Sequence, residues 1–229
     1  MSDRCLKCFK PESVCLCKYT KEIDTGVKFI LLMHPKEFKK QRTGTGYLAH
    51  ICLKDSEIIV GLDFSKNQRL MELLHDPQYY PVLMYPGEDA WHAKKERFTQ
   101  TITQQNKKLL VIILDATWFC SKKMIQYNPF LLELPKLSFF GQYQSIFTFK
   151  REPKPEYIST IECCYYLIKE LQTVSFIPQT IDPEPLMTVF KAMIKLQITA
   201  ENERVLGIRP NTHNYDGKYK KLKQVPDFE

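Results

Sequence analysis

The chain has 229 residues, of which 44% are hydrophobic, and its 33 basic and 26 acidic side chains give a net charge of +7. This length suits one α/β domain with a small appendage, and the apolar content argues against disorder over most of the chain. The basic excess favours anionic partners, nucleic acid first. No apolar run approaches the ~20 residues that span a membrane, and the N-terminus lacks the apolar core of a secretory signal. We therefore expect a cytoplasmic protein with no membrane partner and with reduced thiols.

Four of the eight cysteines lie close together near the N-terminus, as the pairs Cys5 with Cys8 and Cys15 with Cys17. Paired thiolates on tight turns are the usual ligands of a structural Zn²⁺ ion. The second pair has one intervening residue, where two to four are usual. We predict a zinc knuckle within residues 1–24. It should have no catalytic role, because four thiolates leave no open coordination position.

Residues 27–33 are apolar except for Lys28 and form the first predicted strand. The strand ends at His34, and a basic loop with glycines over 35–46 leads to a helix predicted over 47–53. A polar loop before a helix N-terminus is typical of an anion or ligand site. It is not a P-loop, because the Gly-Lys-Thr ending is missing. His34 is a candidate base or ligand, although a loop histidine more often has a structural role.

The remaining elements follow from apolar periodicity and from proline and glycine positions. Strands are predicted over 57–60, 81–85, 109–114 and 145–149, and helices over 67–75, 119–127 and 182–204. A helix start is predicted near 88–91, and 100–108 is predicted to be a polar connector. Ser159 and Glu162 have capping-box spacing and predict a further helix start. Strands alternating with helices predict a mainly parallel sheet flanked by helices.

The strand over 109–114 is the centre of the predicted fold, because six consecutive apolar residues indicate burial on both faces. Asp115 follows at its carboxyl end, which is where ligands sit in open α/β sheets. An acid there costs free energy unless it is hydrogen-bonded or used. Alternatively, Asp115 or Thr117 caps the following helix. These residues alone do not separate the two possibilities.

Several motifs in one order resemble the DTW-domain family of tRNA-uridine aminocarboxypropyltransferases. They are Cys5-x-x-Cys8 with Cys15-x-Cys17, His34-Pro35-x-Glu37 with Arg42-Thr43-x-Thr45-Gly46, Tyr85-Pro86-Gly87, Asp115-x-Thr117-Trp118, and Arg151-Glu152-Pro153 with Ser159-Thr160-Ile161-Glu162. Each motif alone is weak, but the ordered set is specific and covers the chain from Arg4 to about Arg204.

The resemblance implies transfer of the 3-amino-3-carboxypropyl group of S-adenosylmethionine (SAM) to N3 of a tRNA uridine, which gives acp3U and methylthioadenosine. It also implies a SPOUT-like α/β fold with a C-terminal knot. Threaded backbones are rare, so the knot depends on the resemblance alone. The expected division is a zinc-binding knuckle over 1–24, a catalytic domain over 25–205 and a basic, flexible tail over 206–229. The tail either contacts RNA or is simply solvated.

The resemblance and the strand-end positions together suggest roles for individual residues. We expect Asp115, Thr117 and Trp118 to be catalytic, with Asp115 as the proton acceptor or as the group that orients uracil. Trp118 either stacks on a base or packs in the core. The SAM-binding residues are expected to be Tyr85, Pro86, Gly87, Leu114, Arg151, Ser159, Thr160 and Glu162. The tRNA-contacting residues are expected to be His34, Glu37, Arg42, Thr43, Thr45 and Lys122.

Two other functions fit the same sequence. One is a SAM-dependent RNA methyltransferase, which would release S-adenosylhomocysteine in place of methylthioadenosine. The other is a zinc-containing RNA-binding module without catalysis.

Overall fold

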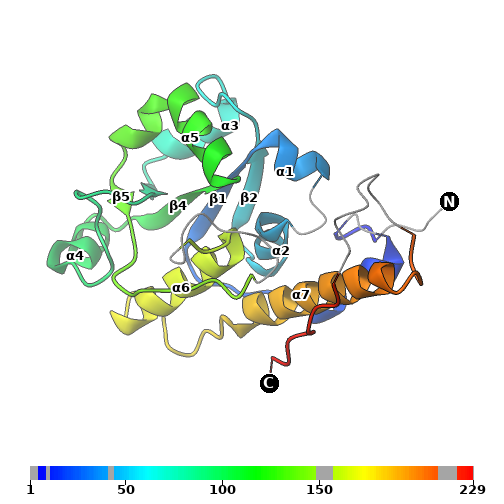
Figure 1. The fold of residues 1–229 in the computed structure, drawn as a ribbon. Coiled ribbons are helices and arrows are strands. Elements are labelled where there is room, and N and C mark those ends of the chain that lie inside the picture. The colour runs from blue at the N-terminus through cyan, green and yellow to red at the C-terminus, as the bar shows by residue number, and fades with distance from the viewer. Residues whose placement is uncertain (1–4, 9–10, 41–43, 148–156, 211–220, 229) are drawn as a thin grey trace.

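The computed structural model describes residues 5–8, 11–40, 44–147, 157–210 and 221–228, and it is built around one five-stranded sheet (Figure 1). The strands are β1 (Lys28–Met33), β2 (Ser56–Val60), β3 (Tyr79–Met84), β4 (Lys108–Asp115) and β5 (Lys136–Leu137), in the order β2-β1-β4-β3-β5. Every neighbouring pair is parallel. The predicted parallel α/β sheet is therefore confirmed.

β4 lies at the centre of the sheet, between β1 and β3. Met33 of β1 pairs with Asp115 of β4, so the carboxyl ends of these two strands lie side by side. Side chains alternate between the two faces of a strand. Val111 and Ile113 pack into one hydrophobic cluster, whereas Leu110 and Ile112 pack into the other. This two-sided burial explains the continuous apolar run.

Helices cover both faces of the sheet (Figure 1). α2 (Thr45–Cys52), α6 (Thr160–Thr173) and α7 (Glu184–Val205) contribute to the larger cluster, together with α4 (Glu96–Gln104). α3 (Gln68–His75) and α5 (Trp118–Tyr127) contribute to the smaller one. The short helices are α1 (Pro35–Lys40) and the 3₁₀ turns η1 (Glu12–Val14), η2 (Cys17–Tyr19) and η3 (Pro129–Glu133).

Four local predictions are wrong. The loop predicted over 35–46 contains α1 over Pro35–Lys40 and the start of α2 at Thr45. No helix starts at 88–91; Trp91 instead forms a bridge to Leu137 and stacks on Tyr80. The predicted connector over 100–108 is largely α4, because Phe98 and Ile102 lie one turn apart and are buried in the core. Residues 145–147 form no strand, and 148–149 lie outside the described residues.

The C-terminal tail was expected to be flexible, but its described part lies along α7. The Asn202 side chain donates to the Lys223 carbonyl at 2.7 Å and accepts from the Lys223 amide at 2.8 Å. Phe228 packs against the larger hydrophobic cluster. Two hydrogen bonds between the Asn202 side chain and the Lys223 backbone and a partly buried ring thus hold this segment against α7. Among the described helices, none is long and apolar enough to cross a membrane.

Candidate functional site

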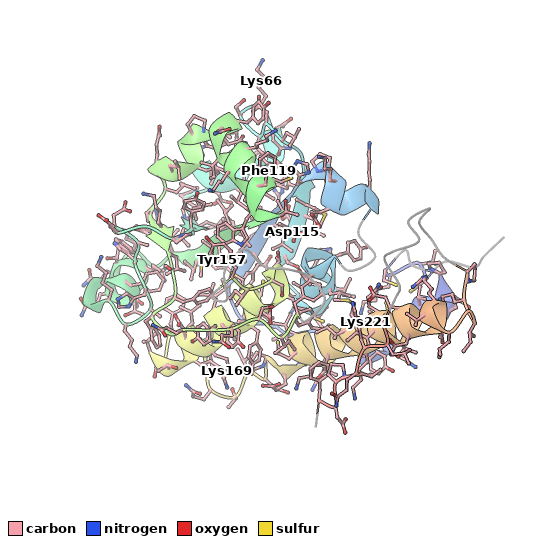
Figure 2. All side chains as sticks on the ribbon, viewed as in Figure 1. Lys66, Asp115, Phe119, Tyr157, Lys169 and Lys221 are labelled. Atoms are coloured by element: carbon pink, nitrogen blue, oxygen red, sulfur yellow. The ribbon has the colours of Figure 1, made fainter. Side chains whose placement is uncertain are left out.

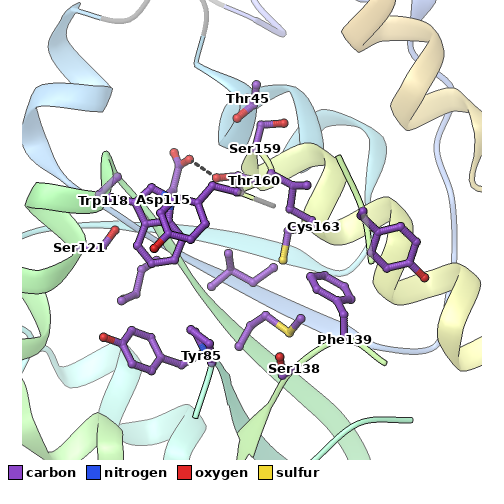
Figure 3. A pocket seen from close by; sticks show the side chains of 18 of the residues that line it. Thr45, Tyr85, Asp115, Trp118, Ser121, Ser138, Phe139, Ser159, Thr160 and Cys163 are labelled. Carbon is purple, nitrogen blue, oxygen red and sulfur yellow. Dashed lines mark hydrogen bonds between the residues drawn. The ribbon is translucent and has the colours of Figure 1, made fainter. Parts of the chain in front are cut away.

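A cavity of about 910 Å³ opens at the carboxyl ends of β3 and β4 (Figure 3). Five segments supply most of its wall: the ends of those two strands, the first turn of α5, the largely irregular segment 137–144 that starts in β5, and the first turn of α6. Glu37 from α1 and Thr45 from α2 complete it. Its position agrees with the general placement of ligands in open α/β sheets. Its volume lies in the range of small-molecule sites.

Asp115 is the last residue of β4 and lies in this cavity with 5% of its surface exposed. The Thr160 hydroxyl donates to its Oδ1 at 2.6 Å (Figure 3). Its carboxylate also packs on the first turn of α2, where a Cβ on Gly46 would lie 2.3 Å from Oδ2. The carboxylate thus lies at the N-terminal turns of α2 and α6, whose dipoles favour negative charge. The glycine is required for this close approach.

Thr117 and not Asp115 caps α5, since the Thr117 side chain accepts from the Cys120 amide at 3.4 Å. This separates the two possibilities left open for the strand end. Asp115 is directed to the cavity, and Thr117 lines the cavity while serving as the N-cap. The Trp118 ring stacks on the Tyr157 ring at a centroid distance of 3.9 Å, and both rings line the cavity. Trp118 therefore belongs to the cavity wall.

Two buried glutamates on α6 hold the irregular wall segment by its backbone. Glu162 accepts from the Ile146 amide at 2.8 Å and the Ser145 hydroxyl at 2.7 Å, and also forms the predicted capping box with Ser159. Two turns further along, Glu170 accepts from the Gly141 amide at 2.9 Å and the Tyr143 hydroxyl at 2.9 Å. The segment has no sheet partners there, so these carboxylates satisfy its donors.

The hydrogen bonds of Glu170 to the cavity wall, including the one from Tyr143, were not predicted from the sequence. Glu170 is 1% exposed. Burial of the phenol raises the pKa of Tyr143, and the hydrogen bond to Glu170 raises it further. The Tyr143 ring also stacks on Tyr166 at 3.9 Å. The available signal was the eight-residue spacing of Glu162 and Glu170, which places two acids on one helix face. Their carboxylates contact a segment 16 to 30 residues earlier in the chain, which helix periodicity does not show.

The cavity is acidic although the chain is basic. Asp115 and Glu37 are among its lining residues, and within the described part of the chain no lysine, arginine or histidine lines it. Both acids are buried, with Glu37 9% exposed. A buried acidic cavity favours a cationic or partly cationic ligand.

The structure brings together many of the predicted site residues and leaves others apart. Those lining the cavity are Glu37, Thr45, Tyr85, Pro86, Leu114, Asp115, Thr117, Trp118, Ser159 and Thr160. Those described but not lining it are His34, Gly87, Lys122 and Glu162. Arg42, Thr43 and Arg151 lie outside the described residues. The roles assigned to all of these residues stay predictions.

His34 supports the backbone beside the cavity. Its amide donates to the Asp115 carbonyl at 3.0 Å, and its Nδ1 accepts from the Lys36 amide at 3.0 Å. Burial lowers the pKa of the imidazole, and the charges of Lys36 and Lys123 lower it further. The backbone amide of His34 thus joins the ends of β1 and β4, while its ring holds the first turn of α1.

The four N-terminal cysteines form a candidate metal centre. All four sulfur atoms lie within 4.8 Å of one another, with Cys5 and Cys17 3.6 Å apart and Cys8 and Cys15 3.7 Å apart. A tetrahedron of thiolates around Zn²⁺ with ~2.3 Å bonds has S···S edges of about 3.8 Å. Backbone amides of Cys8 and Lys7 lower the pKa of the Cys5 thiol to about 6, which favours a thiolate there. The residues therefore fit a structural zinc ion.

The cysteine cluster contacts the helix that carries Gly46. The Tyr47 hydroxyl donates to the Lys7 carbonyl at 3.2 Å, and the Ile23 amide donates to the Cys52 carbonyl at 2.7 Å. Leu16 is buried in the larger hydrophobic cluster. The knuckle thus packs against both ends of α2.

This chain is an α/β protein with a ligand-sized cavity at the carboxyl edge of a parallel sheet and a cluster of four cysteines near its N-terminus. The chain belongs to the DTW domain family, whose model matches residues 2–198. It is 23% identical over 213 residues to tRNA-uridine aminocarboxypropyltransferase 2 of Macaca fascicularis, covering 88% of this chain and 68% of that protein. It is also 23% identical over 210 residues to the protein of the same name from Mus musculus, with the same coverage. No solved structure gives a significant match.

Proposed function

We propose that this protein is a tRNA-uridine aminocarboxypropyltransferase that uses SAM as donor. In the reaction, uridine N3 forms a bond to the donor methylene carbon next to sulfur, the bond between that carbon and sulfur breaks, and the N3 proton leaves. The products are acp3U and methylthioadenosine. Such a tRNA substrate would place the protein in the cytoplasm.

The acidic cavity is the observation that carries the proposal. The donor has a sulfonium and an ammonium group, both cationic, and the described lining offers Asp115 and Glu37 without a basic side chain. Its volume of about 910 Å³ suits a ligand of nucleoside size with room for a second base. Family membership and the names of the two relatives support the same reaction.

The residues of the cavity can perform the steps that the reaction needs from the protein. Asp115 is held by Thr160 in an orientation toward the cavity and can accept the N3 proton or orient the uracil edge. The N-terminus of α6, at Ser159 and Thr160, can hold the donor carboxylate, and Arg151 is a further candidate. Trp118 and Tyr157 offer ring faces for a base. Holding the two reactants in line supplies much of the acceleration.

Two finer expectations belong to this proposal. The SPOUT-like knot requires a threaded crossing before α6, and residues 148–156 lie outside the described residues. The four cysteines are proposed to hold a structural zinc ion, supported by their spacing.

The decisive test is incubation of the purified protein with SAM and unmodified bulk tRNA, followed by mass analysis of nucleosides and adenosine products. We expect acp3U and methylthioadenosine in equal amounts. Methylated nucleoside with S-adenosylhomocysteine would instead establish the methyltransferase. Absence of any product with either tRNA or rRNA, while RNA still binds, would establish the binding module.

A further inference from the structure

The outer face of α5 carries aromatic and basic side chains in an order that core packing does not explain. Phe119 is 69% exposed and Tyr127 is 58% exposed, at the two ends of the helix. Lys122 and Lys123 lie between them and are also exposed. The inward face is formed by Cys120, Ser121, Met124 and Ile125. We call Phe119, Lys122, Lys123 and Tyr127 the α5 stripe.

The stripe begins at the cavity. Phe119 is itself a lining residue, and Figure 2 shows it on α5 beside Asp115 and Tyr157. Phe119 and Tyr127 are eight residues apart, which is about 12 Å along a helix. An elongated ligand whose reacting end enters the cavity would therefore continue along the stripe.

The charges of the stripe select the chemistry of that ligand. The sequence of α5, WFCSKKMIQY, contains two lysines and no acid. Lys123 Nζ lies 4.8 Å from the centre of the Phe119 ring, so one cation and one ring face share the same patch. Exposed rings on either side of two cations match a single-stranded nucleic acid, whose bases stack on the rings and whose phosphates pair with the lysines.

We infer that the α5 stripe binds a single-stranded RNA segment, namely the nucleotides that adjoin the reacting uridine. The inference rests on the proposed function, because it states how the substrate RNA is held outside the cavity. It also implies that the target uridine lies in an unpaired loop, since bases in a helix stack on one another and not on protein rings. Phe119, the ring next to the cavity, takes the base adjoining the uridine.

The test measures RNA binding without SAM, so that it does not depend on catalysis. A labelled single-stranded RNA 12-mer containing uridine and its duplex form are titrated with the full chain by fluorescence anisotropy. Phe119→Ala combined with Tyr127→Ala should weaken single-strand binding by roughly 30-fold or more, because each of the two lost stacks contributes ~1–3 kcal/mol. Binding of the duplex should change little.

The contribution of the two lysines is measured by the salt dependence of RNA affinity. Lys122→Gln with Lys123→Gln should lower the slope of log affinity against log salt by up to about 1.4 on single strands, whereas the aromatic double variant should leave the slope unchanged. Leu206→Ala, also exposed at 59%, and Lys169→Gln, which lies away from Phe119 in Figure 2, are the matched controls and should bind as the parent does. Thermal melts verify that all variants fold.

The measurements distinguish failure of the α5 stripe from failure of the proposed function. If the parent protein forms acp3U and the aromatic double variant binds single-stranded RNA with parental affinity, the stripe is refuted and the proposed function stands. If the parent forms no product but the double variant loses RNA affinity, the stripe stands and the proposed function fails. Equal weakening on single strand and duplex would also refute the stripe, because stacking requires unpaired bases.

Discussion

At the scale of single residues, the position of Asp115 shows how a short motif acquires its geometry. The strand end places the residue, the Thr160 hydroxyl orients one carboxylate oxygen at 2.6 Å, and Gly46 leaves room for the other. The adjacent Thr117 takes over the capping of α5. Asp115 and Thr117 were equal candidates for the helix cap in the sequence, but Thr117 caps α5 and Asp115 lines the cavity.

Asp115→Asn is expected to reduce turnover by roughly 10²- to 10⁴-fold while the donor still binds. The amide keeps the shape of the side chain and can accept the Thr160 hydrogen bond, but it cannot take up a proton. The readouts are methylthioadenosine release and calorimetric binding of SAM. Thr160→Val, which removes the hydrogen bond and keeps the carboxylate, should lose less activity. Near-parental turnover of Asp115→Asn would exclude the proposed role.

Glu57 is expected to make stability depend on acid pH. Hydrogen bonds from Arg69 lower its pKa to about 2, and Lys28 contributes at 2.7 Å. Because the pKa is lowered on folding, the pairing stabilises the protein above about pH 4.5, and this contribution is lost as the pH falls toward 2. Glu57→Gln should cost on the order of 1 kcal/mol at pH 7.

Urea unfolding at pH 7 and pH 2.5 measures this difference, which should shrink at the lower pH. Lys28 keeps its second partner, Asp55 at 2.8 Å, so the substitution does not leave a buried charge alone. A difference of the same size at both pH values would show that the carboxylate charge is not the cause.

At the scale of elements, α6 both supports the sheet and fixes the cavity wall. Its buried face carries Glu162 and Glu170, whose carboxylates take the backbone donors of the irregular segment after β5. The wall is therefore held by hydrogen bonds to a helix in place of a strand ladder.

Glu170→Ala should lower the free energy of unfolding by roughly 2–3 kcal/mol, because the amides of Phe140 and Gly141 lose a buried charged acceptor. It should also raise the KM for the donor, since the wall then moves. Lys169→Ala, on the exposed face of the same helix, is the control and should change neither quantity. Denaturant unfolding and initial-rate kinetics give the two readouts. Unchanged stability would show that other contacts hold the wall.

The N-terminal knuckle is expected to bind one zinc ion per chain through its four thiolates. Replacing Cys5 and Cys8 with Ser should abolish the metal content measured by plasma mass spectrometry. It should also lower the melting temperature, because the core packing of Leu16 and the hydrogen bond of Tyr47 to the Lys7 carbonyl depend on an ordered knuckle. Cys52→Ser is the comparison, since that thiol is buried away from the cluster and should leave the zinc content intact. Full zinc occupancy in the double variant would disprove the centre.

The elements also show where sequence reasoning ends. The strands β1 to β4 and the capped α6 agree with the patterns that predicted them, whereas the strand predicted over 145–149 is not formed at 145–147. α4 was missed because its sequence, ERFTQTITQ, is mostly polar and contains three threonines, which have low helix propensity. It forms because Phe98 and Ile102 are buried by tertiary packing. β5 has two residues, too few for any periodic signal.

At the scale of the whole molecule, charge is distributed unevenly. The chain has a net charge of +7, yet the described cavity lining carries two acids. This arrangement suits a protein that attracts a polyanion to its surface and a cation to its interior.

RNA binding by the full chain should therefore weaken steeply with salt. Affinity for tRNA measured between 50 and 200 mM salt is expected to fall linearly on a double-logarithmic plot, because phosphate contacts release counterions. Donor binding in the cavity, measured in the same buffers, should change far less because that site is shielded from solvent. A flat response for tRNA would show that the basic surface is not its binding site.

The sequence by itself determined the parallel sheet, its central strand, the cluster of four cysteines, the family and the position of Asp115. These follow from local patterns, namely apolar runs, spacings and turn residues, which act over a few positions. Only the tertiary structure decided that the first turns of α2 and α6 meet at Asp115, that Glu170 fixes the cavity wall and that residues 221–228 lie along α7. Each of these depends on contacts between segments tens of residues apart, because burial and hydrogen-bond partners are set by packing and not by neighbours in the chain.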